Sequence, residues 1–318
     1  TLFRSNSTAH ALQYAFNVSG GVTGVVMALL TLLVIMRGLK GVARLSQWLV
    51  PFMATLWVLT SLLITLWHIV ELPSIINLII RSAFGWQEAA AGAAGYTVSQ
   101  AITSGFQRSM FSNEAGMGST PNAAAAAASF PPHPAAQGIV QMIGVLIDTI
   151  VICSASAMVV LLAGHGTKTT SYDGIQLIQH AMSVLVGEWG ASFVAVVMML
   201  FAFTSIVANY IYAENNLIFL RWDKPWAIWL LRIATLSMVV LGSLLSLPVV
   251  WQMADVIMAL MAITNLTAIL LLSPVVRIIA LDYLRQRKLG VTPIFDPDYY
   301  PEIAQQLAPE SWDQPPRQ

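Results

Sequence analysis

The stretch TSGFQRSMFSNEAGMGS, residues 103–119, interrupts a chain that is otherwise strongly apolar. It combines hydroxyl groups, amides, an arginine and a carboxylate with Gly105, Gly116 and Gly118, and membrane-compatible sequence flanks it. Polar and small residues at membrane depth must be covered by protein or line a wet cavity, because lipid cannot satisfy freed backbone groups. The stretch therefore predicts a membrane helix that is broken, with the break at Gly105.

The composition excludes an ordinary soluble domain. Hydrophobic residues make up 57% of the chain and charged residues 9%, whereas soluble proteins carry about 25% charged residues. The formal net charge is zero, so the chain has no basic footprint for nucleic acid. The single cysteine, Cys153, cannot form an intrachain disulfide and is read as a small buried hydrophobe. The sequence predicts an all-α polytopic membrane protein.

The apolar segments predict about seven transmembrane segments, because roughly 20 apolar residues cross a bilayer. They are residues 22–36, 48–69, 75–112, 138–163, 191–220, 227–247 and 254–279. The third contains the interrupted stretch, and a surface helix is expected at 172–187. We expect a transmembrane domain at 1–288 and a solvated cytoplasmic tail at 289–318. Residues 1–10 are too polar for a targeting signal and are read as the end of a longer segment.

The basic residues predict the orientation. Clusters at 37–44, 221–224 and 285–288 fall on one side if seven segments cross the membrane. The positive-inside rule places these clusters in the cytoplasm. We therefore expect a bacterial inner-membrane protein whose chain starts outside and whose C-terminus is cytoplasmic.

The interrupted stretch is the first candidate binding site. In transporters, the free N–H and C=O groups of broken helices bind the carboxylate and ammonium of an amino acid. Two interpretations stay open at this point. The stretch forms such a site, or it is a cytoplasmic loop in which residues 112–114 cap a helix.

The second candidate site lies in the apolar run 191–220. The hydroxyls of Thr204 and Ser205, with a backbone carbonyl, suit sodium, because hard cations prefer oxygen ligands. Alternatively, the hydroxyls bond back to the preceding helical turn. Asn209 lies one turn from Ser205 on the same face. Its amide is expected to bind a substrate or a neighbouring helix.

Other polar residues carry less chemistry. Asp148 and Asp255 are intramembrane acids, which are functional hypotheses by default; Asp148 is expected to pair with a buried donor, and Asp255 to lie near the outer end of its span. The histidines show no metal-ligand spacing and are read as surface or interfacial residues: His10, His68, His133, His165 and His180. No nucleophile and base are paired in the sequence, so we do not expect an enzyme.

Three stretches carry a resemblance to a known family. Residues 105–121 resemble the pattern G-x-x-R-x-x-F-S-N-E-A-G-x-G-S-x-P of the alanine/glycine:cation symporters, also called sodium:alanine symporters. Residues 203–214 and 261–266 resemble two later stretches of the same family. The similarity runs from about residue 9 to the tail, and the enterobacterial subgroup is the nearest match.

The resemblance implies a leucine-transporter-type inverted-repeat fold, of which this chain would hold the last seven helices. Substrate and sodium would bind between two broken helices at the bilayer midplane, and the first of these would lie outside the chain. By position, the second broken helix would contribute Thr103, Ser104, Gly105, Phe106, Met110 and Phe111 to the substrate pocket. Thr204 and Ser205 would bind sodium, and Ser205 and Asn209 would face the substrate.

Two departures from the family pattern bear on the site. The family often has Trp at the position of Asn209, and Asn leaves a larger, more polar pocket. Arg4 lies near the position of a family glutamine, so residues 2–6 are read either as altered sequence or as the start of a truncated gene product.

The leading hypothesis is a secondary active transporter, a sodium-coupled symporter of alanine or glycine that works by alternating access. Sodium is then a co-transported ion, no organic cofactor is expected, and the partners are a small neutral amino acid and the lipid bilayer. One alternative is a truncated, non-transporting fragment or a subunit that needs the missing N-terminal helices. Another is a proton-coupled amino-acid carrier.

Overall fold

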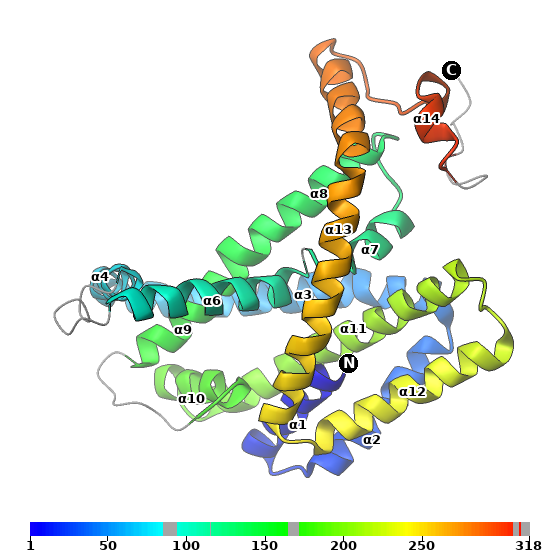
Figure 1. Cartoon of the computed structure of the whole chain (residues 1–318). Coiled ribbons are helices and arrows are strands. Elements are labelled where there is room, and N and C mark those ends of the chain that lie inside the picture. The colour runs from blue at the N-terminus through cyan, green and yellow to red at the C-terminus, as the bar shows by residue number, and fades with distance from the viewer. Residues whose placement is uncertain (85–93, 115, 165–171, 308–311, 313–318) are drawn as a thin grey trace. The chain divides into compact units, whose positions relative to one another are not determined.

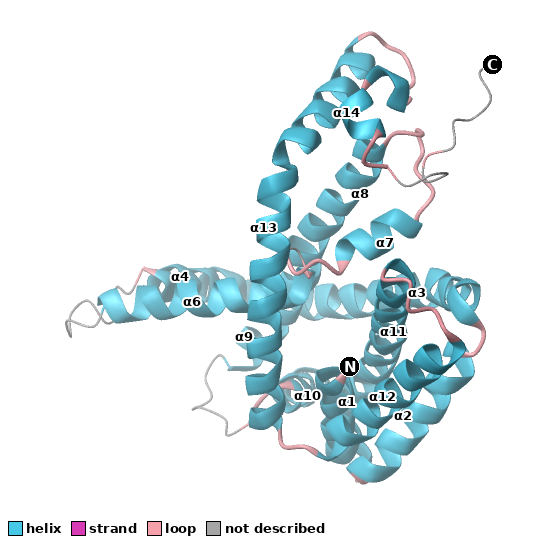
Figure 2. Ribbon diagram, turned by 45° about the vertical axis from the view of Figure 1, so that its right-hand side comes forward, coloured by secondary structure: helices cyan, strands magenta, loops and turns pink. Residues whose placement is uncertain are grey.

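The computed structural model of the chain describes residues 1–84, 94–114, 116–164, 172–307 and 312. These residues form helices, turns and loops, and no strand (Figure 2). The main helices are α1 (Leu2–Phe16), α2 (Gly20–Ile35), α3 (Gly38–Trp67), α4 (Leu72–Ala83), α6 (Ala94–Asn113), α7 (Thr120–Ala126), α8 (Pro134–Ile147), α9 (Ser154–Gly164), α10 (Ile175–Val186), α11 (Trp189–Phe219), α12 (Pro225–Leu244), α13 (Leu247–Lys288) and α14 (Pro301–Ala304). Shorter segments are η1 (Ile69–Glu71), the π-helical η2 (Asp148–Cys153) and η3 (Pro297–Tyr299).

In the described part of the chain, five segments are long and apolar enough to cross a membrane, which confirms an all-α polytopic membrane protein. They are Ser46–Trp67, Pro134–Gly164, Trp189–Phe219, Pro225–Leu244 and Leu247–Lys288. The predicted span at 22–36 corresponds to α2, which has 16 residues and is shorter than these five segments. The predicted span at 75–112 is not one helix. It contains α4 and α6, and residues 85–93 between them lie outside the described part (Figure 1).

The described chain divides into two compact units. The first, unit 1, comprises residues 1–112 and 147–258. Within it α1 packs against α11, α12 and α2 (Figure 1). Buried Met27 of α2, Ala202 and Ile206 of α11, and Val239 of α12 form one of its apolar clusters. Helix α11 therefore lies at the centre of unit 1.

Helix α1 is polar and yet buried. Ser5, Asn6 and Thr8 are fully buried. The Asn6 amide donates to the carbonyls of Gly242 (2.9 Å) and Leu245 (2.6 Å), so a distant part of the chain satisfies it. Small polar side chains allow helices to approach closely and to hydrogen-bond across a membrane interface. The residues read as a polar chain end are thus an internal helix of unit 1.

Helix α10 is the predicted surface helix at 172–187. One of its faces is buried, because Met182 and Gln179 are fully buried. The Gln179 amide donates to the carbonyls of Ala11 (3.0 Å) and Ala191 (3.1 Å). The helix therefore joins α1 to α11, and the sequence did not predict this packing.

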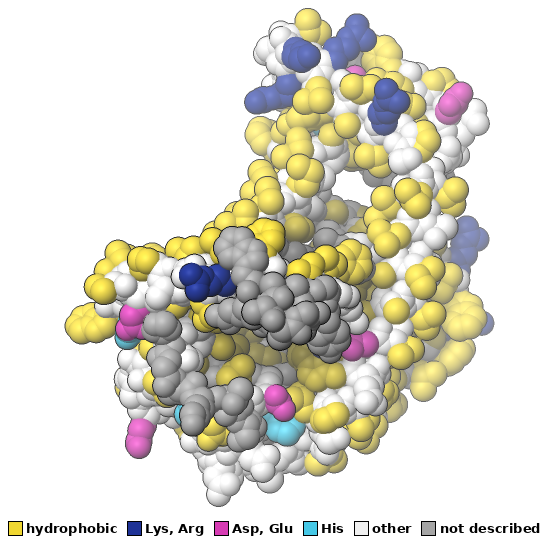
Figure 3. Space-filling view, turned by 60° about the vertical axis from the view of Figure 1, so that its left-hand side comes forward, with side chains coloured by type: hydrophobic (Ala, Val, Ile, Leu, Met, Phe, Trp, Pro, Cys, Tyr) yellow, Lys and Arg dark blue, Asp and Glu magenta, His cyan; other side chains and the backbone are white. Residues whose placement is uncertain are grey.

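The second compact unit, unit 2, comprises residues 113–146 and 259–318. Exposed apolar side chains cover much of α13, as expected of a lipid-facing helix, and Leu270 and Leu271 are more than 70% exposed. Basic side chains gather near the last turn of α13 (Figure 3), which contains Arg285, Arg287 and Lys288.

The C-terminal segment is not a solvated extension. Phe295 and Ile303 are buried, and the Phe295 amide donates to the Pro132 carbonyl at 3.0 Å. Gln286 of α13 exchanges two hydrogen bonds with the backbone of Ile294. That part of the prediction is wrong for residues 294–304, because Phe295 and Ile303 anchor this segment in unit 2. The assignment of 289–318 to the cytoplasm stays a prediction.

His133 anchors this packing and is not a surface histidine as predicted. Its side chain is fully buried. The backbone N–H of Ala135 donates to Nδ1 (3.1 Å), so Nε2 carries the proton and donates to Asp282 Oδ2 (3.2 Å). Burial lowers the pKa of the imidazole from its ordinary 6.5, and the Asp282 carboxylate acts in the opposite direction. Phe295 and Tyr283 pack edge-on against the ring.

We expect His133→Ala to loosen the C-terminal segment. The change removes a buried hydrogen bond to a carboxylate, which contributes about 1.5–3 kcal/mol, and leaves Asp282 with one partner fewer. Hydrogen exchange at the Phe295 amide should become about 10–100-fold faster. His180→Ala, in unit 1, is the matched control and should leave this amide unchanged. Equal exchange in the His133 variant and the parent would contradict the assignment.

Candidate functional site

The predicted break in the 103–119 stretch lies later than expected. Helix α6 runs through Gly105 without interruption and ends at Asn113, so the break predicted at Gly105 is wrong. A glycine inside a helix costs only about 1 kcal/mol. The chain turns instead at Glu114 (φ 52°), Gly116 (φ 91°) and Gly118 (φ 87°), where positive φ favours glycine.

This turn connects two of the sequence motifs. Ser119 Oγ donates to Glu114 Oε2 at 2.6 Å, which ties the turn together before α7 begins. A Cβ at Gly118 would lie 3.1 Å from Oδ1 of Asn265, the asparagine of the 261–266 stretch. Only glycine fits there without displacing Asn265, so Gly118 of the first motif and Asn265 of the third pack against each other in unit 2.

The predicted substrate residues of α6 are not brought against those of α11. Among the described residues, no hydrogen bond joins Thr103, Ser104 or Phe106 to Thr204, Ser205 or Asn209. All residues from 101 to 109 are exposed, Phe106 is 64% exposed, and Gly105 faces open space. The side chains of Met110 and Phe111 lie outside the described part. The roles of these six residues stay predictions.

The polar face of α11 is better defined. Thr204 is buried, and its hydroxyl donates to the carbonyls of Phe201 (3.0 Å) and Leu200 (3.2 Å). This is the back-bonded arrangement that we kept as an alternative, but the oxygen still has lone pairs for a cation. Ser205 and Asn209 are half-buried, and neither side chain hydrogen-bonds within the described residues. Their polar groups are therefore free to meet a ligand.

Sequence reasoning missed Arg232, which lies close to this face. It is a charged residue inside the apolar helix α12, a pattern that signals function or a buried partner. Its Nε donates to the hydroxyl of Tyr210 (3.2 Å), and Tyr210 follows Asn209 on α11 and is buried. Arg232 therefore fixes the orientation of α11 at the residue next to Asn209.

Asp148 has a polar partner, but this partner is exposed and is not the buried donor that was expected. It begins the π-helical turn η2, and its Oδ2 accepts from Ser112 Oγ at 2.9 Å at the end of α6. Cys153 ends the same turn, is partly exposed and lies 3.3 Å from the Ser112 hydroxyl. Cys153 is thus not simply a buried hydrophobe. Single π-helical turns are frequent at functional sites.

Asp255 also has a partner, and it is Arg108 of the first motif. The guanidinium lies 3.7 Å from the carboxylate and 4.0 Å from the centre of the Trp251 ring. Both side chains of the ion pair are more than a third exposed, so it adds little stability. The sequence placed Asp255 near the outer end of its span and did not predict this contact with Arg108.

Helices alone, with several apolar spans and a polar face on the central one, define a multi-pass membrane protein. The sodium:alanine symporter family matches residues 1–297. The chain belongs to this family, which confirms the resemblance found in the sequence. The names of the family and of the relatives describe symporters and carriers, not enzymes.

Three relatives illustrate the match. The chain is 68% identical over 310 residues to the uncharacterized transporter YaaJ of Escherichia coli, covering 98% of this chain and 65% of the relative. It is 43% identical to the amino-acid carrier protein AlsT of Bacillus subtilis, covering 92% and 61%. It is 35% identical to the sodium/alanine symporter AgcS of Methanococcus maripaludis, covering 86% and 59%. The chain spans less than two thirds of the length of these relatives.

Proposed function

We propose that this chain belongs to a secondary active transporter that couples uptake of a small neutral amino acid, alanine or glycine, to sodium. Family membership supports the transport class. The name of the archaeal relative, a sodium/alanine symporter, supports the substrate and the ion. The mechanism is alternating access, in which one site opens to each side of the membrane in turn.

The observation that carries the proposal is the polar face of α11. Ser205 and Asn209 have no hydrogen-bond partner within the described chain, although they are half-buried on a membrane span. Unpaired polar groups at membrane depth are expensive unless a ligand or water meets them. A sodium ion would take the oxygens of Thr204 and Ser205, and the substrate would lie beside Ser205 and Asn209.

The remaining predictions about the site and the membrane belong to the same proposal. Gly105, Phe106, Met110 and Phe111, with Thr103 and Ser104, would form the opposite wall of the substrate pocket. The protein would lie in a bacterial inner membrane with its C-terminus in the cytoplasm, because the basic clusters indicate that side.

Uptake of labelled alanine under separate ion gradients tests the proposal. Cells or vesicles that carry the protein encoded by this gene should accumulate alanine when a sodium gradient is imposed at constant pH. A proton gradient without sodium should give only background uptake. Uptake that follows the proton gradient and ignores sodium would overturn the coupling. Uptake of neither alanine nor glycine would overturn the substrate.

A further inference from the structure

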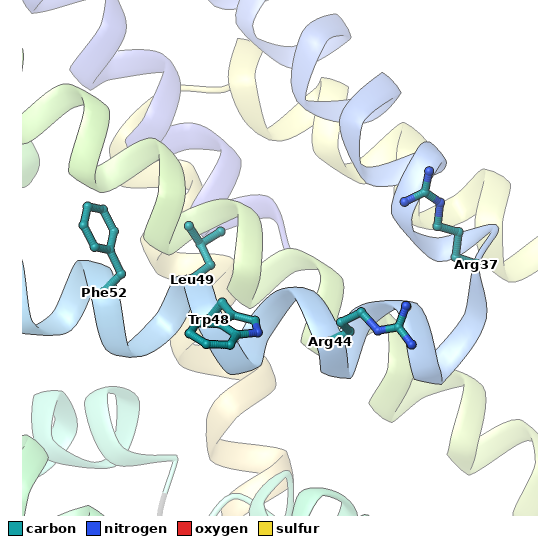
Figure 4. Close-up of a pocket in the computed structure, with 6 residues that line it drawn as sticks. Arg37, Arg44, Trp48, Leu49 and Phe52 are labelled. Atoms are coloured by element: carbon teal, nitrogen blue, oxygen red, sulfur yellow. The ribbon is translucent and has the colours of Figure 1, made fainter.

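A basic and aromatic pocket lies where α2 meets α3. It has a volume of ≈ 490 Å³ and is lined by Arg37, Gly41, Arg44, Trp48, Leu49 and Phe52 (Figure 4). These residues belong to unit 1. In the sequence they are far from Thr204, Ser205 and Asn209. The proposed transport cycle assigns no role to this pocket.

Local backbone geometry builds the pocket. The turn between α2 and α3 passes through Gly38 (φ 65°), a conformation that favours glycine. A Cβ at Gly41 would lie 2.6 Å from the Cβ of Arg37. Glycine at position 41 therefore lets the stem of Arg37 lie against the first turn of α3. Arg37 and Arg44 both line the pocket.

The charge of the pocket is not neutralised by the described protein. Arg37 and Arg44 are exposed, and neither forms an ion pair with a described residue. The first 70 residues of the chain contain no Asp or Glu. Guanidinium groups bind phosphate through paired hydrogen bonds. The pocket thus presents two free groups that suit a phosphate.

The other half of the pocket is apolar and extends along α3 from the arginines. Arg44, Trp48 and Phe52 follow one another along one side of the helix (Figure 4). Along the helix axis, Arg44 and Phe52 are about 12 Å apart. Trp48 is 77% and Phe52 60% exposed. Tryptophan prefers the membrane interface, so this row runs from headgroup depth toward the acyl chains.

We propose that this pocket binds one anionic phospholipid. Arg37 and Arg44 hold the phosphate of the headgroup, and Trp48, Leu49 and Phe52 contact the acyl chains. Basic pockets beside membrane helices bind anionic headgroups, and the apolar row distinguishes a lipid from a free phosphate ion. The bound lipid would anchor the turn between α2 and α3 to the membrane surface.

Native mass spectrometry of the purified chain in detergent tests the proposal. The protein is titrated with phosphatidylglycerol and, separately, with phosphatidylcholine of the same acyl chains. We expect tighter binding of the first phosphatidylglycerol. The double variant Arg37→Gln/Arg44→Gln should lose about fivefold in affinity per arginine, roughly 25-fold in all, for phosphatidylglycerol only. Phe52→Ala should weaken the binding of both lipids.

Two further arms separate this site from general charge effects. Arg285→Gln/Arg287→Gln removes the same charge at the end of α13 and should leave the first phosphatidylglycerol bound as tightly as in the parent. An equal loss in both double variants would overturn the site. Displacement of the lipid by millimolar inorganic phosphate, or equal affinity for the two lipids in the parent, would also overturn it.

Discussion

Ser205→Ala is expected to lower sodium-driven alanine uptake by about 100-fold. The Ser205 hydroxyl has no partner in the described chain, so its removal deletes a ligand group and breaks no internal hydrogen bond. An oxygen that contacts a charged ligand contributes about 1.5–3 kcal/mol, which corresponds to a factor of roughly 10–150. The measurement is the initial uptake rate as a function of sodium and alanine concentration.

Thr204 offers a sharper comparison at the same place. Thr204→Ala should reduce the apparent affinity for sodium more than that for alanine, because this hydroxyl is assigned to the ion alone. Thr204→Ser keeps the oxygen and should retain uptake. Ser192→Ala lies on the same helix, three turns earlier, and is the matched control for expression and packing. If Ser205→Ala and Thr204→Ala both take up alanine at the parental rate, sodium does not bind to α11 as proposed.

Gly242→Ala is expected to destabilise unit 1 by about 1–3 kcal/mol, the usual effect of overpacking. A Cβ there would lie 2.5 Å from the backbone carbonyl oxygen of Leu2, and backbone atoms cannot rotate away. The same close approach places the Gly242 carbonyl at the Asn6 amide, so a shift of α12 also breaks that hydrogen bond. Thermal unfolding followed by size-exclusion chromatography should show a lower midpoint.

Gly144→Ala is the control for this second change. Gly144 lies in the apolar helix α8, and a Cβ there would meet nothing within 4 Å. Alanine is the better helix former by about 1 kcal/mol, so this variant should unfold at the same or a higher temperature. A Gly242 variant that matches the Gly144 variant would show that α1 and α12 are not in close contact.

Local hydropathy was sufficient to predict the long apolar helices. The predicted span 191–220 agrees closely with α11 (Trp189–Phe219), because some 30 apolar residues admit only one interpretation. The placement of Ser205 and Asn209 on a single face follows from the helical period alone. These parts of the candidate site depend on neighbours in sequence, and sequence is enough to predict them.

Partners that are distant in sequence account for the errors. Residues 1–10 look like a polar chain end because the carbonyls that satisfy Asn6 belong to Gly242 and Leu245. His133 looks like a loop histidine because Asp282 lies 149 residues away. The break was predicted at Gly105 because this glycine lies among hydroxyl residues. The positive φ angles occur instead at Glu114, Gly116 and Gly118.

The burial of α1 has a consequence for biosynthesis. Ser5 and Asn6 donate to carbonyls 234 to 239 residues further along the chain. At about 5–20 residues per second, a ribosome needs roughly ten to fifty seconds to make that length. Until that length has been made, these polar groups lack their final hydrogen-bond partners, and lipid offers them none. A membrane insertase or chaperone that shelters this helix during translation would raise the yield of folded protein.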